Sequence, residues 1–197
     1  MKKMLVLSLS TLLIVAATMV PTSFAAEKSE FIATDLFNPL PLPGFPAPQI
    51  GEILAPPTIK CPGAVPTGNP EQPCPLGSRM HSRDGLVVSR LISDDPRVTG
   101  WLTVELNSNL DANFEGPSWG TFRIDLDVGE GFWEGTWQGY RQAYDGYWIG
   151  TINGQAKGYG GIVDGMKMNA EEEIMLVTAL PIAYIGTWEG RIINPRK

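Results

Sequence analysis

The sequence WGTFRIDLDVGEGFWEGTWQGYRQAYDGYWIGT, residues 119–151, repeats a short unit in which an aromatic side chain closely precedes Gly-Thr. The Gly-Thr pairs begin at Gly120, Gly135 and Gly150, and a fourth begins at Gly186. The first three are fifteen residues apart. This spacing suits one strand and one turn of an antiparallel meander and is too short for a repeat that contains a helix. The repeat therefore predicts an all-β fold.

Alternating apolar and polar residues, separated by Gly, Asp and Asn, predict eight strands after residue 83. They span residues 86–92, 97–107, 118–127, 131–140, 147–153, 160–169, 172–178 and 182–193. Turn-forming pairs such as Asn153-Gly154 and Asp164-Gly165 lie between or within these segments. Residues 169–176 also suit a short helix, but the β-rich neighbours favour a strand. We expect an eight-stranded antiparallel barrel, with a β-sandwich as the alternative.

Because strand side chains alternate between two faces, the repeats separate an aromatic face from a polar face. The face of the glycines, here called the Gly face, carries Phe122, Ile124, Leu126, Trp133, Trp137, Trp148, Ile152, Tyr184, Trp188 and Ile192. The opposite, Thr face carries Arg123, Glu134, Gln138, Glu189 and Arg191 among other polar residues. We expect the Gly face to point inward, since outward aromatic residues would need a covering partner. The reverse arrangement would give a polar lumen.

The first 25 residues have the pattern of a secretory signal peptide. Lys2 and Lys3 precede an apolar run, and the segment ends in Ser23-Phe24-Ala25. We expect cleavage after Ala25 and a secreted or periplasmic protein without a membrane anchor. The chain has 15 basic and 21 acidic residues, a formal net charge of −6, and loss of the two lysines makes it more negative. This charge argues against nucleic acid and anionic membranes as partners.

Residues 26–82 are predicted to form a Pro-rich arm before the barrel domain, residues 83–197. Twelve of the seventeen prolines lie between Pro39 and Pro75, and proline disfavours helices and central strands. The segment 36–45 mixes Pro with large apolar residues, including Leu42 and Phe45. Such a segment forms a stiff extended strip that either docks on an aromatic surface or serves as a spacer.

The two cysteines, Cys61 and Cys74, are expected to form a disulfide, because an exported chain meets an oxidising compartment. Their spacing is unlike a Cys-x-x-Cys motif, and His81 is the single histidine. The sequence therefore predicts no metal site and no cofactor.

Candidates for catalysis are few. Glu134 and Glu189 share the Thr face and are the carboxylate pair to consider for glycoside hydrolysis or proton transfer. Such a pair needs one desolvated carboxyl group with a raised pKa beside one that stays ionised. His81 has no nucleophile motif near it, and we interpret it as a polar residue at the junction of arm and barrel. The acidic run Glu171-Glu172-Glu173 is interpreted as a solvated hairpin end.

Residues 116–122, GPSWGTF, and 131–137, GFWEGTW, resemble strands of the allene oxide cyclase and dirigent barrels. This resemblance covers roughly residues 84–193. It implies a calycin-like eight-stranded barrel, frequently a homotrimer, that binds an apolar or phenolic molecule without a cofactor. No catalytic motif of that family matches this chain residue by residue.

Three classes of function follow. The first is a secreted barrel that binds a small apolar or aromatic ligand, lined by Trp133, Trp137, Trp148, Tyr184 and Trp188. The second is a cyclase or isomerase that confines an apolar substrate. The third is a non-catalytic protein-binding domain that uses the Pro-rich arm.

Overall fold

The structure is a computed structural model that describes residues 26–40, 49–69, 72–144, 147–178 and 183–195. The side chains of residues 143–148 and 176–182 lie outside this description. The predicted signal peptide, residues 1–25, and the strip residues Leu42 and Phe45 also lie outside it.

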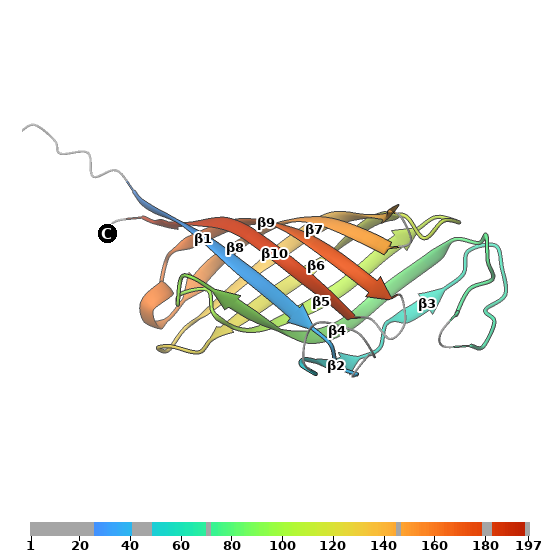
Figure 1. Ribbon diagram of the computed structural model, residues 1–197, viewed down its shortest axis with the longest axis horizontal. Helices are drawn as coiled ribbons and strands as arrows, with labels where there is room; N and C mark the ends of the chain where they lie inside the picture. The colour runs from blue at the N-terminus through green and yellow to red at the C-terminus, as the bar shows by residue number, and fades with distance from the viewer. Residues whose placement is uncertain (1–25, 41–48, 70–71, 145–146, 179–182, 196–197) are drawn as a thin grey trace, which may run out of the picture.

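Eight antiparallel strands form a closed barrel (Figure 1). They are β1 (Glu27–Phe37), β4 (Met80–Ser93), β5 (Gly100–Leu110), β6 (Gly116–Leu126), β7 (Phe132–Tyr144), β8 (Tyr147–Tyr159), β9 (Lys167–Thr178) and β10 (Ala183–Asn194). Strands β4 to β10 follow one another as a meander, and β1 closes the barrel by pairing with both β10 and β4. The prediction of an all-β, eight-stranded antiparallel barrel is confirmed, and the sandwich alternative is excluded.

The two ends of the barrel differ. At the end called here the terminal end, β1 begins and β10 finishes, at the left of Figure 1. A short 3-10 helix, η1 (Gly161–Val163), lies in the turn between β8 and β9 at this end. At the opposite, arm end, β1 leads into residues 38–79, which connect it to β4.

Two short strands lie outside the barrel. They are β2 (Glu52–Ala55) and β3 (Thr58–Lys60), and both pair with β4. Because β1 pairs with residues 90–93 of β4, the three segments β1, β2 and β3 pair with successive parts of the same long strand. The disulfide between Cys61 and Cys74 closes the loop that follows β3, with the two Cα atoms 5.5 Å apart.

The assignment of residues 26–82 to an arm outside the barrel is wrong at its beginning, since β1 is a barrel strand. In β1 the side chains of Phe31, Ala33, Asp35 and Phe37 are buried and alternate with more exposed ones. The dense prolines begin only at Pro39, so proline content gave no reason to extend the arm back to residue 26.

The predicted strands 160–169 and 172–178 are also wrong as two separate elements. Residues 167–178 form a single strand, β9, and residues 160–166 form the turn that precedes it. Gly160 and Gly165 have φ angles of 68° and 75° in this turn, a left-handed conformation that interrupts a strand. The eighth barrel strand is therefore β1.

The Gly face points into the barrel, as expected. Phe122, Ile124, Trp133, Trp188 and Ile192 are all buried. The glycines make room for aromatic rings, because a Cβ atom at Gly190 would lie 2.4 Å from Cζ of Phe31. A small barrel can enclose several large rings only where neighbouring positions carry no side chain.

Candidate ligand site in the barrel lumen

The terminal half of the lumen is filled by the protein's own side chains. Its core includes Phe31, Leu102, Phe122, Ile124, Trp133, Trp137, Met168, Trp188 and Ile192. Val98, in the turn before β5, and Val163 of η1 are completely buried at this end. The terminal half is therefore a packed hydrophobic core.

Three of the predicted ligand-binding tryptophans, Trp133, Trp137 and Trp188, belong to this core. Trp133 Nε1 donates a hydrogen bond to the Arg97 carbonyl oxygen at 2.6 Å, and Trp137 Nε1 donates one to the Glu105 carbonyl oxygen at 3.1 Å. Both indoles are buried, and their only polar atoms are satisfied by the backbone. This arrangement fits a structural role for the two rings.

A pair of carboxyl groups lies where this aromatic core ends. Asp35 on β1 is 1% exposed and Glu172 on β9 is 5% exposed. Strand β10 runs between these two strands, and its Gly186 is paired with Asp35. A Cβ atom at Gly186 would lie 2.1 Å from Glu172 Oε1 and 3.3 Å from Asp35 Cβ. The two carboxyl groups thus share the space that Gly186 leaves free.

Ser89 on β4 and Tyr184 on β10 complete this acidic cluster, which we define as Asp35, Ser89, Glu172 and Tyr184. Ser89 is completely buried, and the ring of Tyr184 stacks on Phe37 with ring centres 5.2 Å apart. The arm half of the lumen also contains Val87, Val104, Leu106 and Ile174. The acidic cluster therefore lies between an aromatic core and an aliphatic wall.

Burial controls the protonation of the cluster. It raises the pKa of Asp35 to about 7, although the nearby hydroxyl groups of Ser89 and Tyr184 act in the opposite direction. Burial, together with the charge of Asp35, raises the pKa of Glu172 well above its usual range. The pKa of Tyr184 is also raised, mainly by burial. Because two adjacent buried carboxylates repel each other, the pair retains a proton at neutral pH.

Several polar atoms here have no regular hydrogen bond within the described part of the chain. They are Asp35 Oδ1, Ser89 Oγ, Glu172 Oε1 and the neighbouring Trp188 Nε1. Asp35, Ser89, Glu172 and Tyr184 lie close enough to influence one another's pKa, but these four atoms do not reach regular hydrogen-bond geometry. Buried polar atoms without partners are uncommon in folded proteins and are typical of binding sites and sites of internal water.

Arg141 extends into the lumen from the opposite wall. It lies on β7, four strands from β1 in the order of the barrel, at a position that alternates with the outward-facing Tyr140 and Gln142. Burial lowers the pKa of its guanidinium group to about 10. The lumen therefore carries a basic group on one wall and the acidic cluster on the other.

The structure distributes the remaining predicted site residues differently. Tyr184 belongs to the acidic cluster and Trp188 borders it, whereas the side chain of Trp148 lies outside the described residues. Glu134 on β7 and Glu189 on β10 are both exposed on the outside of the barrel, with β8 and β9 between their strands. These two carboxyl groups form no pair, and neither is desolvated, so the geometry gives them no acid-base function.

Sequence reasoning missed both members of the buried acid pair. The interpretation of Glu171-Glu172-Glu173 as a solvated hairpin end is wrong at Glu172, which lies in the middle of β9. A period-two pattern was available, since Met168, Ala170 and Glu172 alternate with more exposed residues. Asp35 was missed because the strand that carries it, β1, was assigned to the arm.

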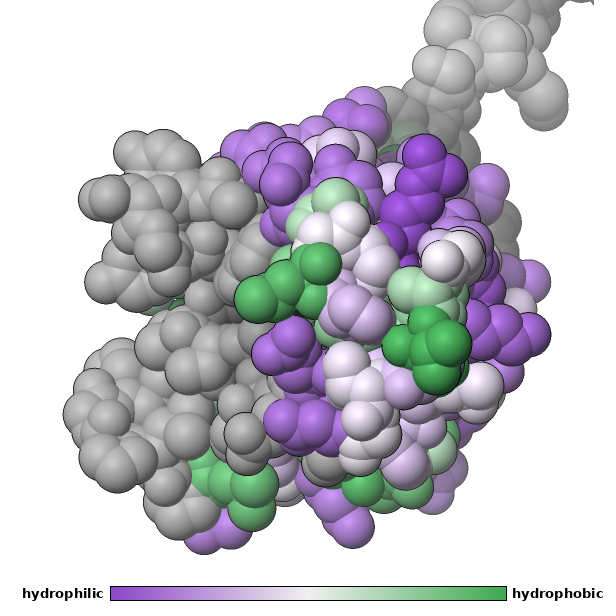
Figure 2. Space-filling view, turned by 90° about the vertical axis from the view of Figure 1, so that its right-hand side faces the viewer, coloured by the Kyte–Doolittle hydropathy of each residue, from purple (hydrophilic) through white to green (hydrophobic). Residues whose placement is uncertain are grey.

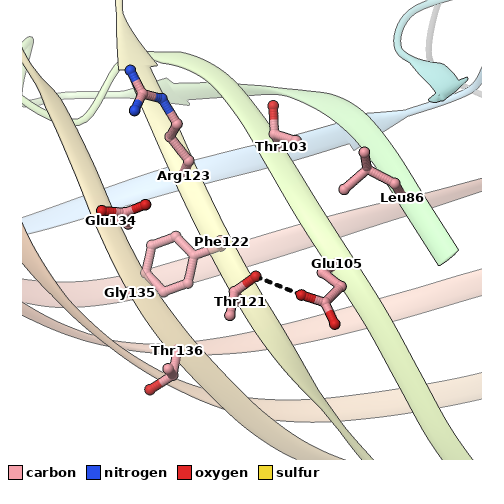
Figure 3. Close-up of a pocket in the computed structure, with 9 residues that line it drawn as sticks. All are labelled: Leu86, Thr103, Glu105, Thr121, Phe122, Arg123, Glu134, Gly135 and Thr136. Carbon is pink, nitrogen blue, oxygen red and sulfur yellow. Dashed lines mark hydrogen bonds between the residues drawn. The ribbon is translucent and has the colours of Figure 1, made fainter. Parts of the chain in front are cut away.

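The outer face of the barrel has shallow hollows. One of about 360 Å³ is lined by Thr103, Glu105, Thr121, Arg123, Glu134 and neighbouring residues (Figure 3). Thr121 Oγ1 donates a hydrogen bond to Glu105 Oε2 at 2.9 Å, and Arg123 forms an ion pair with Asp125 at 2.7 Å. These polar side chains therefore satisfy one another on an open surface.

The arm end presents a mixed surface, in which hydrophobic residues interrupt hydrophilic ones (Figure 2). Among the residues that the structure describes, no group of three or more His, Cys, Asp or Glu side chains could hold a metal ion. No helix of the described chain has the length and hydrophobicity needed to cross a membrane. Comparison with models of known families, with curated proteins and with solved structures finds no match for the chain.

Proposed function

We propose that this barrel binds a small apolar or aromatic molecule in the arm half of its lumen. The acidic cluster carries the proposal, because it presents buried polar atoms without regular hydrogen bonds at the point where the protein's own aromatic core ends. A ligand with an apolar body and one polar group would complete these hydrogen bonds and pack against the aliphatic wall. Tyr184 and Trp188 are the predicted ligand-binding residues that border this position.

Two further features support a ligand-binding role. The resemblance of residues 116–122 and 131–137 to allene oxide cyclase and dirigent strands favours a barrel that accepts apolar or phenolic molecules. The disulfide between Cys61 and Cys74 fits an oxidising extracellular compartment, and we propose export by cleavage of residues 1–25. A secreted binding protein is consistent with both features.

The second candidate function is a cofactor-free isomerase or cyclase, and the protonation of the acid pair favours it. A carboxyl group whose pKa lies near 7 both donates and accepts a proton readily at neutral pH. Glu172 would hold the second proton beside it. In this function Asp35 and Glu172, rather than Glu134 and Glu189, would transfer protons within the confined lumen.

Native mass spectrometry on the mature protein exported from its own host tests the binding function. We expect an excess mass that is lost on denaturation. The variant Gly150→Phe should abolish this excess mass, because Gly150 lies on the Gly face, where Ile174 Cβ, at 3.8 Å, is the nearest described atom to an added Cβ. Thr151→Phe, which adds the same ring at the exposed neighbouring position, is the control. Retention of the mass in Gly150→Phe would contradict a ligand in the arm half.

A further inference from the structure

The unpaired atoms of the acidic cluster are mostly acceptors. Asp35 Oδ1 and Glu172 Oε1 are carboxyl oxygens, and Ser89 Oγ both donates and accepts. All three belong to residues that are at least nine-tenths buried. A group that satisfies them together must therefore supply several hydrogen-bond donors to one small volume.

Among the residues that the structure describes, no basic side chain acts on the cluster. Asp35 and Glu172 respond to burial, to each other and to Ser89, Tyr184, Trp188 and the Leu36 backbone. Arg141 stands on the opposite wall, and the shift of its pKa results from burial without a contribution from either acid. Within the described residues, the two buried acids are therefore compensated by the protons that they retain and not by a cation.

From this arrangement we propose that the lumen ligand carries a primary amine, which Asp35, Glu172 and Ser89 hold as an ammonium group. The inference rests on the proposed function, and it specifies the polar end of the ligand. An ammonium group has three donors and no acceptor, which matches the three acceptor atoms of the cluster.

Proton balance gives the proposal a measurable signature. The amine enters as its ammonium form, and the acid pair releases a proton to the buffer, so that a carboxylate faces the bound cation. The fraction of acid pairs that have already lost this proton increases as the pH rises toward the pKa of Asp35, about 7. Affinity for an amine should therefore increase as the pH rises from 5 to 7, by up to about tenfold per pH unit.

Three probes of similar shape test the charge preference on the full mature protein: phenethylamine, 2-phenylethanol and phenylacetate. Isothermal titration calorimetry at pH 7 should show that phenethylamine binds at least about tenfold more tightly than the other two. Titration in phosphate and in MOPS, whose ionisation enthalpies differ, should show proton release on binding. Asp35→Asn and Glu172→Gln should each weaken phenethylamine binding by about tenfold or more, since each removes one carboxylate. Glu173→Gln, at the exposed neighbouring position, should leave binding unchanged.

The outcomes separate this inference from the proposed function. Tighter binding of 2-phenylethanol or phenylacetate than of phenethylamine would refute the amine and keep the binding barrel. Binding of phenethylamine without proton release, or with unchanged affinity in a folded Glu172→Gln variant, would also refute it. If none of the three probes binds and the exported protein carries no bound molecule, both the amine and the binding function are wrong.

Discussion

Glu172 on β9 lies diagonally across from Gly186 on β10, and the carboxyl oxygen Oε1 of Glu172 occupies the space next to the Gly186 Cα. A Cβ atom at Gly186 would lie only 2.1 Å from that oxygen. This contact explains how a small barrel accommodates a second buried acid beside Asp35. The acidic cluster therefore depends on a residue without a side chain.

Gly186→Ala should displace the Glu172 carboxyl group and destabilise the barrel. An added methyl group in a packed interior costs about 1–3 kcal/mol, which denaturant unfolding measures directly. Gly150→Ala is the matched control on the adjoining part of the same face, because Ile174 Cβ at 3.8 Å is the nearest described atom to its added Cβ. Equal stabilities of the two variants would contradict the contact between Glu172 and Gly186.

The stability of the barrel should decrease as the pH rises from about 4 to about 7. The folded pKa of Asp35, about 7, lies above the value of 3.8 for the unfolded chain, so the native state binds more protons in this interval. The free energy of unfolding is therefore highest below pH 4 as far as this group is concerned, and it falls until Asp35 ionises. A shift of this size corresponds to at most about 4 kcal/mol, since each pKa unit is worth 1.36 kcal/mol.

Asp35→Asn should reduce the slope of this part of the pH profile, because an amide does not titrate. The raised pKa of Glu172 leaves a remaining slope of the same sign. Urea unfolding of the native chain and the variant at pH 5 and pH 8 makes the comparison, with Glu173→Gln as the control for an exposed acid on β9. A native chain that gains stability between pH 5 and pH 8 would show that Asp35 is not protonated in the folded state.

The sequence predicted the barrel because its strongest pattern, the aromatic and Gly-Thr repeat, lies in consecutive strands of the meander. Local turn chemistry and period two are enough to identify β6, β7 and β8. The closing strand β1 was missed because its pairing with β10 joins residues far apart in the chain, and no local pattern encodes that contact. The buried acids were missed for a different reason, since hydrophobicity alone assigns Asp and Glu to the surface.

Reduction of the disulfide, or the double variant Cys61→Ser and Cys74→Ser, should loosen β3 while leaving the barrel intact. In the chain-entropy model, a crosslink between residues 13 positions apart stabilises by about 3 kcal/mol. This constraint acts on the loop after β3. Strand β3 itself pairs with β4 over only three residues, so it depends on the closed loop. Hydrogen exchange should therefore accelerate at residues 58–60 and stay slow in β7 to β9. Equal acceleration in both regions would show that the loop and the barrel unfold as one unit.

Trp133→Phe and Trp188→Phe should have different effects, although both side chains are buried tryptophans. Loss of the Trp133 indole leaves a void and deprives the Arg97 carbonyl oxygen of its hydrogen bond, so the free energy of unfolding should fall by about 2–4 kcal/mol. Trp188 Nε1 has no regular hydrogen bond among the described residues, so Trp188→Phe should cost less stability. The indole of Trp188 lowers the pKa of Glu172, so loss of this indole should keep Glu172 more firmly in the protonated form.

Thermal unfolding, together with phenethylamine titration, separates the two effects: Trp133→Phe should change mainly stability, and Trp188→Phe mainly affinity. The same loss of affinity in both folded variants would contradict the division of the lumen into a core and a ligand site.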